Sequence, residues 1–255
     1  MLTVCLKRDY NIFVIVKYIL TLMLVAINAK LSFSMDKYLQ TPKIISGWNI
    51  SCSVDDGSIS FNGNNWIFKT SKNGCKGGFF KQRAEISSPK ALKLSTKAKY
   101  EFQSIFSIKS NEESRGILNV EKFEFFQIHD GRLGCAPPLS IGFTKKGKLR
   151  LLGDYKVGES EGQNCDRDIM FDVGNTVVRR DGTEYKINVL LDFDGKSAFA
   201  VTVYLNDKLE VKGKYSPPNE DKYFKSKYYY FKHGVYSENM FDYVLKSQIK
   251  MKLIQ

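Results

Sequence analysis

The sequence has few of the features that mark helical, metal-binding or low-complexity proteins. Only 6 of its 255 residues are proline. After the first 34 residues we find no amphipathic helical pattern, no internal repeat and no low-complexity tract, and no Cys-x-x-Cys spacing occurs. These absences argue against a helical fold and against a zinc site. We expect the protein to need no metal and no cofactor.

The composition favours a packed, sheet-rich protein. Hydrophobic residues make up 43% of the chain and aromatic residues 13%, with 14 Tyr and 18 Phe. This content is sufficient for a core and excludes a disordered chain. The formal net charge of +12 attracts polyanions such as nucleic acid, anionic lipid or acidic polysaccharide. The lysines are scattered along the chain, so charge alone does not select among these partners.

Residues 1–34 have the pattern of a secretory signal peptide. Lys7 and Arg8 form a positive start, an apolar run extends from Tyr18 to Ile27, and residues 32–34 supply small side chains for cleavage. An uncleaved membrane anchor is the alternative. We therefore expect a secreted or periplasmic mature chain over residues 35–255.

Four cysteines follow this leader, at Cys52, Cys75, Cys135 and Cys165. An even number of cysteines in an exported chain predicts disulfides, and four cysteines allow three pairings. We favour Cys52–Cys75 and Cys135–Cys165, because each closes a local strand–loop–strand segment. Four buried free thiols are the alternative.

The mature chain is predicted to be one all-β domain. Short stretches alternate between apolar and polar residues and are separated by turn signals such as Asn64-Asn65 and Asn206-Asp207. This spacing is typical of a sandwich, jelly roll or barrel. Strands are expected at 58–62, 66–70, 81–86, 99–109, 121–129, on both sides of a hairpin over 141–152, and at 185–193, 198–205, 209–212, 228–236 and 244–254.

Three of these strands carry polar or aromatic side chains on one face and apolar side chains behind them. Gly234 in the last of the three leaves a gap that lets a ligand approach. His233 points to the apolar side, and we expect it to be structural. The residues on the polar faces are Arg83 and Glu85, then Gln127 and His129, then Tyr230, Lys232, Tyr236 and Glu238.

These residues carry a resemblance to a known family. Gln127-Ile-His129 and Tyr230-Phe-Lys-His-Gly-Val-Tyr236 resemble motifs of the β-jelly-roll alginate lyases, polysaccharide lyase family seven. Arg83-Ala-Glu85-Ile-Ser87 is similar to the family's Arg-x-Glu-x-Arg motif, but Ser87 replaces the second arginine. Glu238 stands where the last motif usually has Gln.

The Lys232-x-x-x-Tyr236 spacing and Pro137-Pro138 also look like the heparinase I-like and glucuronan-lyase relatives. The resemblance implies a two-sheet antiparallel jelly roll with a concave substrate cleft. It also implies β-eliminating cleavage of a uronic-acid polymer, alginate-like or glucuronan/heparin-like. The Gln-Ile-His form is associated with guluronate-containing alginate, whereas the heparinase-like features point to other uronates.

The resemblance implies a catalytic group and a substrate-binding group. In the catalytic group, Arg83 and Gln127 hold the C6 carboxylate of the sugar, and His129 and Tyr236 act as acid and base. The substrate-binding group consists of Lys232, Tyr230, Glu85 and Glu238. Within it, we expect Glu85 to orient Arg83 or a neighbour.

A non-catalytic carbohydrate-binding jelly roll is the alternative function, since the same cleft can hold a sugar without cleaving it. A nucleic-acid binder is disfavoured, because the chain has no helix-turn-helix, zinc module or RRM-like aromatic motif. We expect a monomer whose partner is an anionic polysaccharide, with no membrane contact by the mature chain.

Overall fold

The computed structural model describes residues 44–51, 54–72, 80–88, 91–111, 120–159, 162 and 164–254. They fall within one compact unit spanning Pro42–Gln255. The predicted leader and the predicted Cys52–Cys75 disulfide lie outside the described residues. Within the described part of the chain, no helix is long and apolar enough to cross a membrane.

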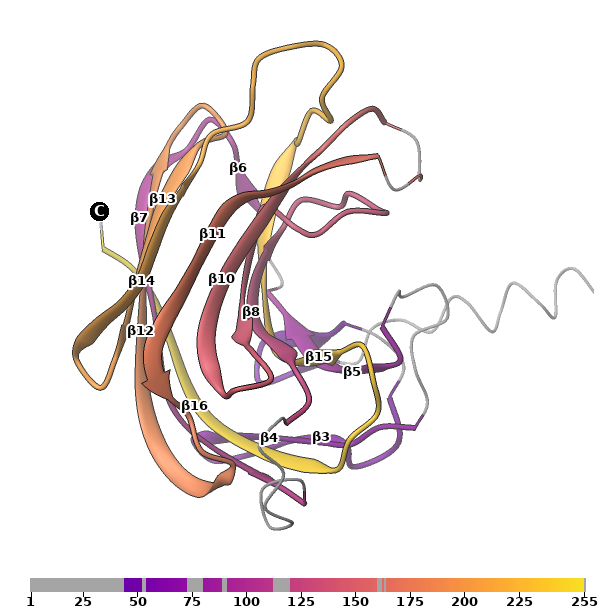
Figure 1. The fold of residues 1–255 in the computed structure, drawn as a ribbon, viewed down its shortest axis with the longest axis vertical. Coiled ribbons are helices and arrows are strands. Elements are labelled where there is room, and N and C mark those ends of the chain that lie inside the picture. Colours follow the sequence, from indigo (N-terminus) through magenta and orange to yellow (C-terminus); the bar gives the residue numbers. More distant parts are fainter. Residues whose placement is uncertain are drawn as a thin grey trace, which may run out of the picture. The chain divides into compact units, whose positions relative to one another are not determined.

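Two antiparallel sheets form the molecule, and the described residues contribute sixteen strands to them (Figure 1). The nine-stranded sheet contains, in spatial order, β1 (Ile44–Ile45), β2 (Trp48–Ile50), β5 (Gln82–Ser87), β15 (Tyr228–Ser237), β8 (Phe123–His129), β9 (Leu139–Phe143), β10 (Lys148–Lys156) and β11 (Cys165–Val177), with β6 (Leu92–Lys93) paired to β15.

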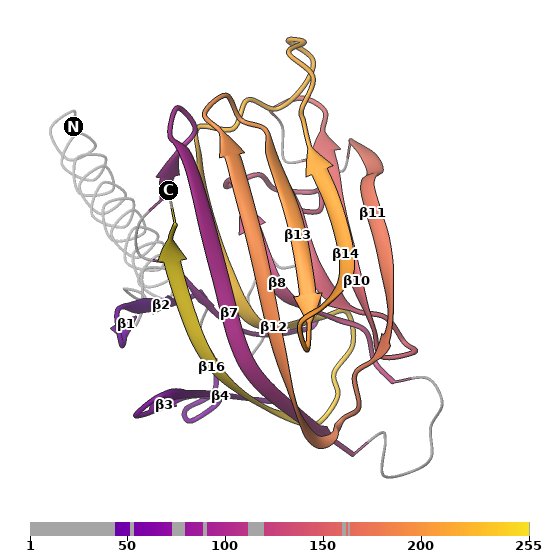
Figure 2. The ribbon, with the colours of Figure 1, turned by 90° about the vertical axis from the view of Figure 1, so that its left-hand side faces the viewer.

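The seven-stranded sheet packs along the outer side of the first, and Figure 2 shows its long strands side by side. Its order is β14 (Lys208–Tyr215), β13 (Phe199–Leu205), β12 (Asp181–Asp194), β7 (Lys97–Ser110), β16 (Tyr243–Leu253), β4 (Asn65–Lys69) and β3 (Ile59–Asn62). The chain is therefore an all-β jelly-roll sandwich, which confirms the predicted fold class.

Aromatic side chains fill the space between the two sheets. Phe102 of β7 packs on Phe126 of β8 with ring centroids 4.5 Å apart, and Phe106 packs on Phe125 at 4.8 Å. All four rings are buried. The apolar side chains of β5 and β15 are buried in the same core. The opposite face of β5, β15 and β8 is therefore free to form a site.

The strand β11 is absent from the sequence-based expectations. It begins with the polar, exposed run Asp166 to Asp168, and two register shifts against β10 interrupt its alternation. The side chain of Glu210 in β14 accepts hydrogen bonds from the amides of Asn175 (2.8 Å) and Thr176 (3.0 Å) on β11. This contact joins the edges of the two sheets and occupies backbone donors that an edge strand otherwise exposes.

Candidate active site

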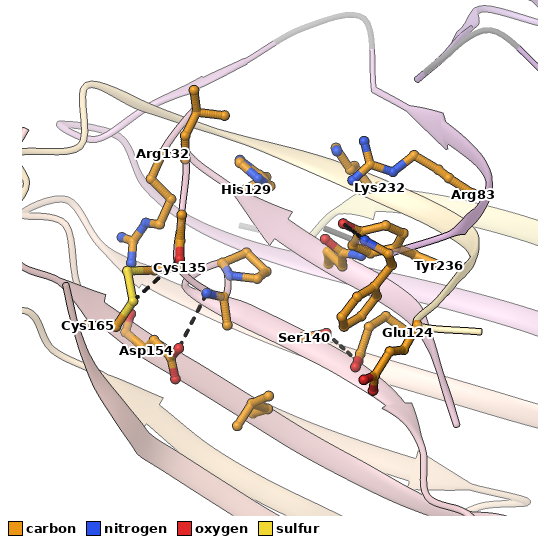
Figure 3. A pocket seen from close by; sticks show the side chains of 18 of the residues that line it. Arg83, Glu124, His129, Arg132, Cys135, Ser140, Asp154, Cys165, Lys232 and Tyr236 are labelled. Atoms are coloured by element: carbon orange, nitrogen blue, oxygen red, sulfur yellow. Dashed lines mark hydrogen bonds between the residues drawn. A yellow bond between two sulfur atoms is a disulfide. The ribbon is translucent and has the colours of Figure 1, made fainter. Parts of the chain in front are cut away.

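A cavity of about 750 Å³ lies on the concave face of the nine-stranded sheet (Figure 3). Glu85 is the one residue of the predicted set of eight that does not line it, because its side chain is buried beneath the floor. The predicted residues that line the cavity are Arg83, Gln127, His129, Tyr230, Lys232, Tyr236 and Glu238.

Strand register explains why residues so distant in sequence meet here. Lys232 of β15 lies directly opposite Gln127 of β8, and Tyr230 lies opposite His129. On the other side of β15, Tyr236 lies opposite Arg83 of β5. Directly opposite residues in antiparallel strands share a face of the sheet, so these side chains form one floor.

Gly234 allows two strands to approach each other closely and does not line the cavity. Its φ of +142° lies in a region that side-chain-bearing residues rarely adopt, and a Cβ there would lie 2.2 Å from the carbonyl oxygen of Ala84. The glycine is therefore required for the close approach of β15 to β5. Gly234 is not among the residues that line the cavity, so the prediction that it leaves a gap for a ligand is wrong.

Glu85 holds two floor residues from below. It is only 2% exposed and accepts a hydrogen bond from Nε2 of Gln127 at 2.9 Å. Its other oxygen lies 3.3 Å from Nε of Arg83. The hydrogen bond from Gln127 and the ion pair with Arg83 orient both side chains, so Glu85 is a positioning residue in this geometry.

Lys232 places a buried amine in the floor. It is 7% exposed, and no carboxylate of the described residues forms an ion pair with it. Burial lowers the pKa of its ammonium; Arg83 lowers this pKa further, and Glu85 opposes both. A buried cation without an ion-pair partner favours an anionic ligand at this position.

His129 is neutral and carries its proton on the nitrogen that remains available. The amide of Gly131 donates to Nδ1 at 3.0 Å, so the proton of the neutral ring is on Nε2. Burial, followed by the positive charge of Lys232, lowers the pKa of His129 to about 3. Tyr230 packs beside the ring with centroids 5.3 Å apart.

Tyr236 lies at the junction of three contacts. The guanidinium carbon of Arg83 is 4.1 Å from its ring centroid, and the ring of Phe80 packs on it at 4.5 Å. The Phe80 amide donates to its hydroxyl oxygen at 3.3 Å.

Glu238, half-exposed at the rim, forms an ion pair with Lys122 at 2.7 Å.

The sequence-based expectations missed Glu124, a carboxylate in the floor. It precedes Gln127 by three residues, so simple alternation places it on the buried face. A register shift between Glu124 and Phe126 turns it into the cavity instead, where it is 8% exposed. Two consecutive buried rings, Phe125 and Phe126, are the sequence signal of this bulge.

Both carboxylate oxygens of Glu124 have partners in the cavity floor. It accepts a hydrogen bond from Oγ of Ser140 at 2.5 Å and forms an ion pair with Arg150 of β10. A Cβ on Gly142 of β9 would lie 2.5 Å from the Glu124 Oε2, so this glycine gives the carboxylate room to cross β9. The pairing leaves little net charge at this end of the cavity.

A disulfide and a buried ion pair build the far wall. Cys135 is bonded to Cys165 at the start of β11, which confirms the second predicted pairing. Arg132 pairs with Asp130 at 2.6 Å and donates to the carbonyl of Asp154 at 2.7 Å, with both charged side chains buried. These contacts fix the loop that presents the Gly131 amide to His129.

Within the described residues, no group of three or more His, Cys, Asp or Glu side chains has an arrangement that holds a metal ion.

Solved polysaccharide lyases share this fold. The chain superposes on the endo-β-1,4-glucuronan lyase of the fungus Trichoderma reesei over 82% of its own length and 92% of the other, with a TM-score of 0.55 and 12% identity. For the exolytic PL7 alginate lyase AlyA5 of Zobellia galactanivorans the shares are 81% and 95%, the TM-score is 0.52 and the identity 10%. No protein-family model and no curated sequence matches the chain. At these identities the likeness establishes the fold alone.

Proposed function

We propose that the protein is a secreted polysaccharide lyase that cleaves an anionic uronic-acid polymer by β-elimination. The observation that carries the proposal is the meeting of Arg83, Gln127, a neutral His129 and the buried amine of Lys232 beside the hydroxyl of Tyr236. The apolar leader and the Cys135–Cys165 disulfide support export, because disulfides persist in oxidising compartments.

The donors of the floor suit the C6 carboxylate of a uronate. Loss of the C5 proton places negative charge on this carboxylate, and preorganised donors stabilise that charge as it develops. Arg83 supplies a planar guanidinium, Gln127 a neutral amide and His129 its Nε2–H. Lys232 adds an amine donor, and no carboxylate of the described residues forms an ion pair with it.

We assign the proton transfer to Tyr236 rather than His129. Nδ1 of His129 already accepts the Gly131 amide and Nε2 carries a proton, so the neutral ring can donate but has no lone pair free for the C5 proton. The phenol oxygen of Tyr236 accepts the C5 proton while its own proton passes to the glycosidic oxygen. The C5–H electron pair forms the C4=C5 double bond, the C4–O bond breaks, and the tyrosine ends as it began.

The experiment is ultraviolet absorbance during incubation with alginate, polyguluronate, polymannuronate, glucuronan and heparin-type glycans. The unsaturated uronate formed by β-elimination absorbs where the substrates do not. We expect a rise with one polymer, and a loss of roughly 10²–10⁴-fold in rate for Tyr236→Phe with binding retained, as removal of an acid–base group gives.

Folded wild-type protein that binds one of these polymers without cleaving it would support the carbohydrate-binding alternative and contradict the lyase proposal. Equal rates for wild type and Tyr236→Phe would contradict the assignment of Tyr236 while leaving the lyase activity established.

A further inference from the structure

We propose that the saccharide chain runs from the cavity across β9 and β10 onto the exposed ring of Phe171 on β11, which acts as a sugar-stacking subsite. This inference rests on the proposed function and adds to it a requirement for a chain of several sugar residues. Phe171 is 59% exposed, and it lies on a strand that borders the cavity.

One straight row of residues connects the reaction centre to Phe171. Lys232 lies opposite Gln127, Gln127 opposite Ser140, Ser140 opposite Leu152, and Leu152 opposite Phe171. Because directly opposite residues share a face, Phe171 points to the same side of the sheet as the floor. Three strand spacings of about 4.8 Å separate Gln127 from Phe171, roughly 14 Å in all. This span exceeds one sugar ring, so Phe171 meets a different sugar from the one held at Gln127.

A second row confirms that the face continues in this direction. Gly142 of β9 lies opposite Arg150, and Arg150 lies opposite Val173 of β11, which is exposed. Leu152 lines the cavity, and Leu133, exposed on the far wall, also lines it. We call the apolar shelf the set formed by Leu152, Phe171 and Val173, which these two rows join.

The shelf differs chemically from the reaction centre. The positive charge of Arg150 beside it is neutralised by Glu124, whereas Lys232 at the other end forms no ion pair with the described carboxylates. Sugar rings present C–H groups on one face, and these pack on aromatic and aliphatic side chains. The shelf therefore binds the apolar face of a sugar, while the reaction centre binds a carboxylate.

A saccharide fits the shelf better than the edge strand of a second protein copy. Besides the two amides bound by Glu210, the amide of Lys212 donates to the Asp172 side chain at 3.0 Å. These contacts tie β11 to β14 along the edge where another strand would add. The exposed apolar side chains instead continue the surface of the cavity.

The test compares Phe171→Ala with Phe171→Trp and with Ile105→Ala on the polymer that the wild type cleaves. Ile105 is 46% exposed on β7 of the other sheet and serves as a matched control for loss of an exposed apolar side chain. We expect Phe171→Ala to raise KM for the polymer by roughly three- to tenfold with little change in kcat, the effect of losing one stacking contact. Phe171→Trp keeps an aromatic ring and should have the wild-type KM. Ile105→Ala should also leave the KM unchanged.

The shortest oligosaccharide that is cleaved provides the decisive comparison. Phe171→Ala should cleave it as the wild type does, because a chain that ends within the reaction centre does not reach β11. An unchanged KM for the polymer, or an equal loss on short and long chains, would overturn the subsite while the lyase proposal stands. A change in the oligomeric mass of Phe171→Ala would also overturn the subsite, since that result assigns the shelf to a second copy of the chain.

If the wild type cleaves no polymer, the proposed function fails and the subsite is judged by polymer binding in calorimetry. Weaker binding by Phe171→Ala than by Ile105→Ala would then support the subsite, and equal binding by the two variants would overturn it.

Discussion

The two histidines of the chain should make folding stability depend steeply on pH. His233 is fully buried between the sheets, where its ring bonds to the Phe125 carbonyl oxygen at 3.0 Å and to Oγ of Ser247 at 2.8 Å. Burial lowers the pKa of His233 to about 3, and His129 is lowered to a similar value. The unfolded chain titrates both near 6.5, so it binds protons in a range where the folded chain does not.

The direction and size of the change in folding stability follow from this difference in pKa between the folded and unfolded chain. A histidine whose pKa is lowered by folding contributes stability above pH 6.5, and that contribution is lost as the pH falls towards 3. At about pH 5, protonation of the unfolded state removes about 2 kcal/mol for His233. His129 contributes up to the same amount, reduced because solvent in the cavity reaches part of its ring. The total loss is about 2–4 kcal/mol, while Asp and Glu titrate mainly below this range.

The assay is urea unfolding at about pH 7 and about pH 5 for the wild type and for His129→Gln. We expect the free energy of unfolding of the wild type to fall between the two conditions. The variant should show a smaller fall, because only His233 remains. An unfolding free energy equal at both pH values would refute the reasoning, as would an identical pH dependence for the variant.

Three further variants test the support of the site. Glu85→Gln keeps the shape of the side chain but removes the charge beneath the floor; we expect a loss of about 1–3 kcal/mol in urea unfolding and a lower kcat/KM. Gly234→Ala should lower unfolding stability by about 2–4 kcal/mol, because its Cβ meets a neighbouring backbone, and an unchanged melting temperature would contradict the close approach. Replacing Cys135 and Cys165 together by Ser should cost about 3–4 kcal/mol for a separation of 30 residues, and reduction of the wild type should reproduce this loss if the bond is intact.

Much of the site follows from strand alternation alone. On β5 and β15 the polar face keeps its period of two, so the pattern correctly places Arg83, Lys232 and Tyr236 on the cavity side. The same alternation identifies Gln127 and His129 at the end of β8, beyond its bulge. What the pattern cannot supply is the order of strands, which here brings β5, β15 and β8 together although β15 lies far from both in sequence.

The residues that were missed depend on irregular backbone or on neighbours. Glu124 faces the cavity only because one extra residue of β8 breaks the alternation. Phe171 lies in a polar edge strand with two register shifts, and its place on the cavity face emerges only from its pairing with Leu152. The role of Gly234 is likewise set by the carbonyl of another strand, which no local pattern contains.

The most direct test of the central claim is cleavage of the accepted polyuronate in oxygen-18 water, followed by mass spectrometry of the products. β-Elimination adds no water, so we predict products that lack oxygen-18 at the broken bond and whose masses sum to that of the substrate. Products that contain oxygen-18 from the cleavage step, with a combined mass greater by one water, would identify hydrolysis and contradict the account.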